Sequence, residues 1–328
     1  MKEPSKILVI RFSSIGDIIY TTPVVRSLKK RFPNAEICFL TKPAFKYLYQ
    51  NNPYLSKLYL LEPKLLDTVK IIKDEKFDLI IDLHNNLRTS IIKLLTQIPA
   101  LTYKKERLKK WLALKLKLKS FTPNKHLVDR YLETVKSLDV VNDGNPVDYF
   151  LGKEYQLDQF LPATHQNYVA FIIGATHFTK RLPNLKIIEI CKGIKQPIVL
   201  VGGKDVKANA DLISAAVGNQ VVNLCGAVNL DESIFILSKA EKVIGFDTGL
   251  THISGAFDKP LVSIWGGTTP ELLGVQPYHI SNSYMASVDL PCRPCSKFGL
   301  EKCPLGHFKC MENIHTESIV NYVNKEQL

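Results

Sequence analysis

The residues best suited to chemistry lie where apolar runs end in polar or glycine-rich turns. The apolar run 243–246 has the length of a buried parallel strand, and Asp247, Thr248 and Gly249 follow it directly. Apolar residues then return at helical spacing from Leu250 onward. Such a turn leaves backbone N–H groups free at the carboxyl edge of a sheet, where they favour a phosphate. An ordinary strand-to-helix joint capped by Asp247 or Thr248 is the alternative.

Three further polar loops follow predicted strands in the same way. They are Ser13–Asp17, Gly174–Arg181 and Gly202–Asp205. Together the four loops offer backbone N–H groups and cationic side chains for a diphosphate, and carboxylates for ribose or sugar hydroxyls. Neither GxxxxGK[ST] nor a clean GxGxxG occurs, so the sequence favours neither a P-loop NTPase nor a dinucleotide dehydrogenase.

The elements that must position these loops alternate between strand and helix. In the first half we predict strands at 6–12, 37–40, 57–61 and 78–83, and helices at 18–32, 44–49, 65–73 and 87–95. After a poorly periodic linker at 141–166, strands are predicted at 168–173, 198–201, 221–223, 243–246 and 261–264. Alternation of this kind predicts βαβ units and parallel sheets, here as two facing Rossmann-like α/β domains with a cleft between them.

Length and charge set limits on the partners. A chain of 328 residues predicts two domains. No apolar run approaches 18 residues, so we expect neither a signal peptide nor a membrane span, and a cytoplasmic protein. The net charge is +12, and residues 1–160 hold most of it, with 28 Lys/Arg against 17 Asp/Glu. This asymmetry predicts an anionic partner for the N-terminal half.

The segment 102–121 concentrates that positive charge among leucines. It carries Lys104, Lys105, Arg107, Lys109, Lys110, Lys115, Lys117 and Lys119. A basic helix with an apolar face can lie on an anionic membrane or hold a phosphorylated lipid, and a solvated helix whose leucines face the core is the alternative. With Trp111 alone it has no series of aromatic residues for stacking bases, which argues against nucleic acid.

Four of the seven cysteines cluster near the end of the chain. Cys292 and Cys295 have CxxC spacing, and Cys303 and Cys310 follow. This set predicts either a structural zinc site or reduced thiols that pack a loop.

Several of these segments together resemble one enzyme family. Ser13–Asp17, Gly174-Ala175 with Lys180-Arg181-Leu182-Pro183, Asp247–His252 and Cys292–Cys310 are similar to the ADP-heptose:lipopolysaccharide heptosyltransferases of glycosyltransferase family 9, over roughly residues 6–315. The resemblance implies a GT-B fold with an acceptor-binding domain at 1–155 and an ADP-sugar-binding domain at 156–312. A C-terminal helix at 313–328 would cross back to the N-terminal domain.

The activity implied by the resemblance is an inverting, metal-independent transfer of heptose. The donor would be ADP-heptose and the acceptor the lipid A–Kdo inner core of lipopolysaccharide, at the inner face of the inner membrane and without a catalytic cofactor. Alternatives are transfer from another nucleotide-sugar, a sugar-nucleotide epimerase, or a non-catalytic basic protein that binds membranes or RNA. The family's usual proline and tryptophan are replaced by Ile173 and Leu182, which leaves the donor sugar open.

By position, the resemblance also assigns residue roles. Asp17 would be the general base, and a helix cap is its alternative role. Lys180 would stabilise the leaving ADP. Donor binding would fall to Ser13, Gly174, Arg181, Asp205, Asp247, Thr248, Gly249, Leu250 and His252. Asp205 stands where the family usually has a glutamate. Acceptor binding would involve Asn86, Arg88, Lys109 and Lys110.

Overall fold

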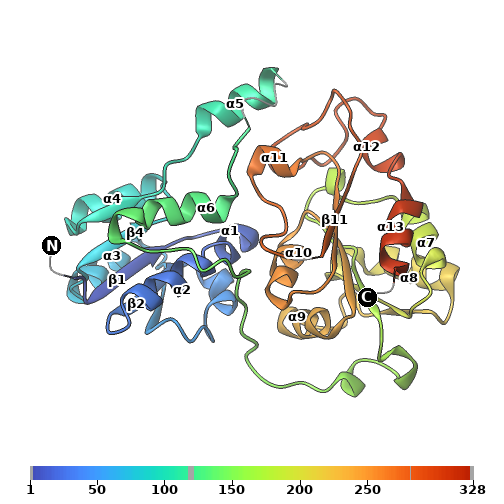
Figure 1. The fold of residues 1–328 in the computed structure, drawn as a ribbon, viewed down its shortest axis with the longest axis horizontal. Coiled ribbons are helices and arrows are strands. Elements are labelled where there is room, and N and C mark those ends of the chain that lie inside the picture. The colour runs from blue at the N-terminus through green and yellow to red at the C-terminus, as the bar shows by residue number, and fades with distance from the viewer. Residues whose placement is uncertain (1–2, 117–121, 281, 326–328) are drawn as a thin grey trace. The chain divides into compact units, whose positions relative to one another are not determined.

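The computed structural model describes residues 3–116, 122–280 and 282–325. The chain divides into two compact units. Unit 1 comprises Met1–Arg107 and Lys125–Gly152, and unit 2 comprises Leu108–Asn124 and Lys153–Leu328. Each unit contains one parallel sheet with helices between its strands, as the alternating pattern predicts (Figure 1). Lys117 and Lys119 of the basic segment lie outside the described residues.

Unit 1 is built on a five-stranded sheet. Its strands are β1 (Lys6–Ile10), β2 (Glu36–Thr41), β3 (Lys57–Leu60), β4 (Leu79–Asp82) and β5 (Ala100–Thr102). They lie in the order β3-β2-β1-β4-β5, and every pairing is parallel. The central strand β1 pairs on both sides, with Ile7 opposite Ile37 and Leu79. Its apolar run is buried, as expected for a strand covered on both faces.

The helices of unit 1 follow the predicted rhythm with one correction. They are α1 (Ile15–Ile19), α2 (Thr22–Arg31), the 3₁₀ helix η1 (Pro43–Leu48), α3 (Leu65–Asp74), α4 (Leu87–Thr96), α6 (Leu127–Leu132) and the 3₁₀ helix η3 (Glu133–Leu138). The prediction of one helix over 18–32 is wrong, because the chain breaks at Tyr20 and Thr21. Pro23 has no N–H to donate to the Ile19 carbonyl four residues back, and the Thr22 hydroxyl donates to that carbonyl instead at 2.8 Å.

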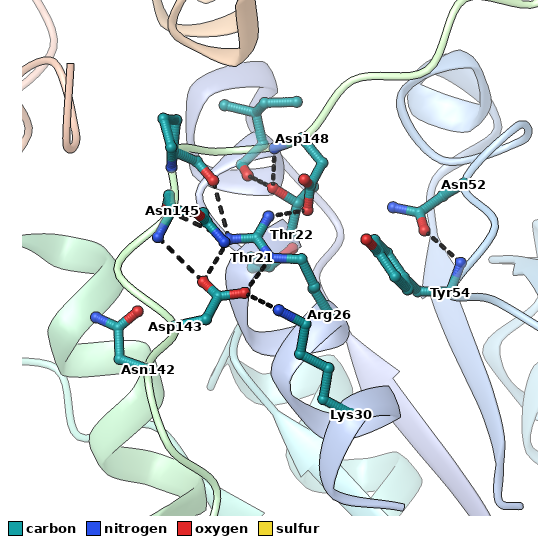
Figure 2. A network of polar contacts seen from close by, with 12 residues as sticks. Thr21, Thr22, Arg26, Lys30, Asn52, Tyr54, Asn142, Asp143, Asn145 and Asp148 are labelled. Carbon is teal, nitrogen blue, oxygen red and sulfur yellow. Dashed lines mark hydrogen bonds and ion pairs between the residues drawn. The ribbon is translucent and has the colours of Figure 1, made fainter. Parts of the chain in front are cut away.

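Within unit 1, Arg26 of α2 binds the segment 142–148 (Figure 2). Its Nε donates to Asp143 Oδ2 at 2.7 Å, and a terminal nitrogen donates to Asp143 Oδ1 at 2.9 Å. Its other terminal nitrogen pairs with Asp148, and Lys30 adds an ion pair to Asp143 at 2.6 Å. Because the guanidinium is buried and binds two carboxylates, these charged contacts stabilise the packing of the segment 142–148 on α2.

Unit 2 is built on a six-stranded sheet. Its strands are β6 (Val169–Ile172), β7 (Ile198–Val201), β8 (Val221–Asn223), β9 (Lys242–Phe246), β10 (Leu261–Trp265) and β11 (Ser283–Ser287). Their order is β11-β10-β9-β6-β7-β8, again with parallel pairing throughout. Read from β8, this is the order of β3-β2-β1-β4-β5 in unit 1 with one strand added.

Longer helices and short helical turns connect these strands. The α-helices are α7 (Asn184–Gly193), α8 (Lys207–Val217), α9 (Leu230–Lys239), α10 (Gly249–Ser254), α11 (Pro270–Leu273), α12 (Lys309–Glu312) and α13 (Thr316–Asn324). The 3₁₀ helices include η6 (Phe178–Lys180) and η7 (Lys204–Val206). The C-terminal helix α13 packs on α7, where Val320 fits against Gly193. Among the described residues, no helix combines the length and apolar character needed to cross a bilayer.

Candidate active site

Each sheet has one place where its strand order reverses direction. In unit 1 this place lies between β1 and β4, and in unit 2 it lies between β6 and β9. Open α/β sheets bind ligands outside the carboxyl ends of such strands. The loops that leave these four strands are Phe12–Asp17, Leu83–Arg88, Gly174–Arg181 and Asp247–Gly249. They include most of the residues that the sequence singled out.

Asp17 lies at the carboxyl end of β1, in the first turn of α1. Its Oδ2 accepts hydrogen bonds from the Ser14 N–H at 3.2 Å and the Ser14 hydroxyl at 3.0 Å, and it pairs with Arg11 at 2.8 Å. Asp17 therefore accepts a hydrogen bond from the N-cap residue of α1, which is the kind of contact expected if it helps to cap this helix. About a third of the side chain stays exposed, at 32%. The carboxylate is thus accessible as well as anchored.

The charge state of Asp17 follows from these neighbours. Burial raises the pKa of the carboxyl group, but the Arg11 charge and the hydrogen bonds from Ser14 outweigh it and hold the pKa below its ordinary value. Asp17 is therefore ionised at neutral pH, as a general base must be.

The loop after β4 presents the predicted acceptor residues. Asn86 caps α4, and its Oδ1 accepts from the Thr89 N–H at 3.0 Å. Arg88 is exposed, and no residue that the structure describes forms a hydrogen bond or ion pair with its guanidinium. His84 packs against Phe12, and burial lowers the pKa of its imidazole to about 4. This loop thus offers a neutral imidazole and an uncommitted cation.

In unit 2, Lys180 and Asp247 meet at the switch point. The ammonium group of Lys180 pairs with Asp247 Oδ2 at 2.6 Å and donates to the Asp247 carbonyl oxygen at 3.1 Å. Lysine has three donors, and these are its two acceptors among the described residues. One N–H of a side chain that is 14% exposed is therefore left for a ligand oxygen.

The Asp247 carboxylate is fully engaged with the protein. Besides Lys180, Oδ2 accepts from the Thr268 hydroxyl at 2.8 Å, and Oδ1 lies 3.2 Å from His252 Nε2. Burial would raise the pKa of this carboxyl group, but the hydrogen bond to His252 and the Lys180 charge hold it below its usual range. His252 thus bonds to the site rather than only packing in the helix.

Backbone contacts hold Lys180 in place. The Thr179 N–H donates to the Leu300 carbonyl at 3.1 Å, and the Gly267 N–H donates to the Thr179 carbonyl at 2.9 Å. The short helix η6 is therefore bonded on one side to the loop after β10. These contacts fix the backbone next to Lys180, and the contacts with Asp247 order its side chain, so less ordering remains when the ammonium binds an anion.

Arg181 and Asp205 bind each other. Arg181 donates to the Ala175 carbonyl at 2.6 Å and pairs with Asp205 at 2.8 Å. Gly174 lies beside the loop after β7, since a Cβ there would come within 3.6 Å of the Gly202 Cα. Three of the predicted donor residues thus gather in one place, at neighbouring strand ends.

The turn after β9 leaves amide groups available. Thr248 is the N-cap of α10, and no acceptor within the described chain takes a hydrogen bond from the Gly249 or Leu250 N–H. Gly245 explains how β9 and α10 approach so closely, because a Cβ there would lie 2.3 Å from the Thr251 hydroxyl oxygen. Ser13, the remaining predicted donor residue, belongs to unit 1, where its carbonyl accepts from Arg11 at 2.8 Å.

The four clustered cysteines are not arranged as metal ligands in the part of the chain that the structure describes. Within 3–116, 122–280 and 282–325, no group of three or more His, Cys, Asp or Glu side chains could hold a metal ion. Cys310 is buried in the apolar core of unit 2, and burial raises the pKa of its thiol to about 11. The zinc alternative therefore has no support here, whereas Cys310 packs as the other alternative predicts.

Helix α5 (Arg107–Leu116) carries the predicted basic residues. Lys109 is exposed, and Lys110 donates to the Leu273 carbonyl at 3.4 Å. The leucines do not all face a core: Leu108 is 70% exposed and Trp111 is 55% exposed, whereas Ala113 is buried.

Sequence reasoning missed two members of these sites, Arg11 and Thr268. Arg11 was available as a signal, since it is a charged residue that directly follows the buried strand β1. The sequence gave no signal for Thr268, because its hydrogen bond to Asp247 depends on how the loop after β10 packs beside that residue.

Comparison with known proteins identifies the family of this chain. The model of glycosyltransferase family 9 (heptosyltransferase) matches residues 66–305, so the chain belongs to this family. A lipopolysaccharide heptosyltransferase 1 from Pseudomonas aeruginosa is 23% identical over 314 residues, covering 89% of this chain and 86% of the relative.

Two solved structures share the fold. The E. coli ADP-heptose lipopolysaccharide heptosyltransferase II has a TM-score of 0.72 at 20% identity, covering 97% of both chains. The E. coli heptosyltransferase WaaC with ADP has a TM-score of 0.64 at 18% identity, covering 86% of this chain and 93% of that one. The predicted family, the glycosyltransferase class and the GT-B α/β fold are therefore confirmed.

Proposed function

We propose that this chain transfers heptose from ADP-heptose to the inner core of lipopolysaccharide, with inversion at the anomeric carbon and without a metal. The observation that carries this proposal is the pair of switch points. One presents an ionised carboxylate at Asp17, and the other presents Lys180 beside free amide groups. Family membership supports the heptosyl donor, and the WaaC structure with ADP supports the nucleotide.

In this proposal Asp17 takes the proton from the acceptor hydroxyl as its oxygen attacks the anomeric carbon. The bond from that carbon to the ADP oxygen breaks, and negative charge develops on the diphosphate. Lys180 and the Gly249 and Leu250 amides would face that charge, which is the task that a metal ion has in other transferases. Attack from the side opposite ADP inverts the anomeric centre.

Arg181, Asp205 and Gly174 would hold the nucleotide. Their strand-end position is where α/β sheets bind ribose and phosphate. On the acceptor side, Arg88 is available to pair with a carboxylate or phosphate of the core sugars. Asn86 is less available, because its side chain already caps α4.

We further propose that the protein works peripherally at the inner face of the inner membrane. Helix α5 supports this, since Leu108, Trp111 and Leu116 are exposed among Arg107, Lys109 and Lys115. A helix with exposed apolar and cationic side chains suits an anionic lipid surface, where the acceptor lipid would reside.

The experiment that tests the proposed mechanism replaces Asp17 by Asn, which keeps the size of the side chain but cannot take the proton. We expect turnover to fall roughly 10²–10⁴-fold, with ADP affinity unchanged. Asp143→Asn is the matched control, because it also removes a carboxylate from a buried arginine of unit 1, and it should retain turnover. If Asp17→Asn keeps the wild-type rate, the base lies elsewhere.

A further inference from the structure

Each of the three guanidinium nitrogens of Arg11 has a partner at the carboxyl edge of the unit 1 sheet. Nε donates to the Ser13 carbonyl at 2.8 Å, and one terminal nitrogen donates to the Leu83 carbonyl at 2.7 Å. The other terminal nitrogen pairs with Asp17 at 2.8 Å, and the side chain is only 7% exposed. Because the guanidinium is planar, contacts in three directions fix its orientation.

Those contacts join the two strands that flank the switch point. Arg11 directly follows β1, and Leu83 directly follows β4. The arginine therefore ties the position of Asp17 to the rigid sheet rather than to α1 alone, which is only five residues long.

The two oxygens of Asp17 differ as a result. Oδ2 forms an ion pair with Arg11 and accepts hydrogen bonds from the N–H and the hydroxyl of Ser14. In the part of the chain that the structure describes, every hydrogen bond and ion pair of this carboxylate is made by Oδ2 and none by Oδ1, and the side chain is partly exposed. One oxygen is anchored, and the other is presented to solvent or to a substrate.

We propose that Arg11 is a positioning residue for the reaction, which holds one oxygen of Asp17 so that the other is aimed at the acceptor hydroxyl. This inference rests on the proposed function of Asp17 as the base. Arg11 touches neither substrate, and its effect passes through the carboxylate. It also sets the pH range of the enzyme, because a nearby cation favours the ionised form of Asp17.

The test measures turnover against pH for Arg11→Met, Arg11→Lys and Arg26→Met. Arg26 is the matched control, since it is another buried arginine of unit 1 bound to carboxylates, but it holds the segment 142–148 (Figure 2). Turnover is followed with ADP-heptose and a lipid A–Kdo acceptor, and folding is followed by thermal melting.

For Arg11→Met we expect kcat to fall about 10- to 100-fold, because a base displaced by about 1 Å loses rate on that scale. The acidic limb of the rate profile should move upward by about 1 to 3 pH units, because Asp17 loses the cation that lowers its pKa. Arg11→Lys keeps the positive charge but loses the planar guanidinium and its three contacts. The acidic limb of its rate profile should therefore stay in place while kcat falls. Arg26→Met should lower the melting temperature and leave the acidic limb unmoved.

A double-mutant cycle decides whether Arg11 acts through Asp17. In the Asp17→Asn background, Arg11→Met should cause no further loss of kcat. The proposal is overturned if Arg11→Met costs as much in that background as in the wild type, or keeps the wild-type limb. If Arg11→Met does not fold, Arg11→Lys with wild-type kcat overturns it. Wild-type turnover in Asp17→Asn instead refutes the base assignment itself, which is a different failure.

Discussion

Lys180 is the residue on which stabilisation of the leaving group depends in the proposed mechanism. Its ammonium is positioned by Asp247 and by the backbone of η6, with one donor left over. A cation held before the substrate arrives needs no reorganisation when charge develops, and this is why such groups contribute strongly to rate.

Replacing Lys180 by Ala should therefore lower kcat by roughly 10²–10³-fold. The change also leaves the buried Asp247 with Thr268 and His252 alone, so a thermal melt must accompany the kinetics. Lys186→Ala, which removes a partly exposed lysine of α7 from its ion pair with Glu189, is the control and should behave as wild type. A loss confined to KM would show that Lys180 binds ground and transition states equally.

At the scale of residues, the sequence predicted which residues lie at the candidate site better than it predicted the side-chain contacts that they form. The Asp-Thr-Gly turn identifies Asp247, and its position after a buried strand is evident from the apolar run before it. His252 contacts this carboxylate from α10, only five residues further along the chain. The contacts with Lys180 and Thr268 depend instead on segments that are distant in the sequence, and sequence spacing carries no information on such contacts.

At the scale of elements, the central strands were all predicted, whereas only two of the four edge strands, β3 and β8, were. The central strands β1, β6 and β9 are continuous apolar runs, as strands covered on both faces must be. The edge strands β5 and β11 were missed, because β5 has only three residues and most residues of β11 are at least partly exposed, so neither forms a continuous apolar run. The break between α1 and α2 was also missed, although Pro23 signals it.

Helix α5 yields a prediction about lipid. Replacing Leu108 and Trp111 by Ser should weaken binding to vesicles of phosphatidylcholine and phosphatidylglycerol by at least about tenfold. Burying one large apolar side chain is worth about 1.5–3 kcal/mol, and 1.4 kcal/mol is about tenfold. Sedimentation with the vesicles measures this.

Leu212→Ser supplies the control, because Leu212 is similarly exposed but lies on α8 and not on α5. Wild-type binding should also fall with salt, since exposed charges are screened within about 10 Å at 0.1 M. Unchanged binding by the α5 variant, or equal binding of the wild type to neutral vesicles, would contradict a membrane role for this helix.

At the scale of the whole molecule, the positive charge is concentrated in the first half of the chain rather than in one unit, because most of the basic helix α5 belongs to unit 2. The excess of Lys and Arg lies almost wholly in residues 1–160, which include unit 1 and α5. The diphosphate-binding residues proposed above lie in unit 2, where specific groups rather than net charge carry the interaction. The excess of Lys and Arg in the first half of the chain suits an enzyme whose acceptor is an anionic lipid.

The central claim is the transfer itself, and one measurement tests it most directly. The purified protein is incubated with β-linked ADP-heptose and a lipid A–Kdo acceptor in the presence of EDTA, and the product is characterised by mass spectrometry and NMR. We predict that the acceptor gains one heptose, that the new linkage is α because the reaction inverts, and that EDTA leaves the rate unchanged. A product that retains the β configuration, a rate abolished by EDTA, or transfer only from a different nucleotide-sugar would contradict the account.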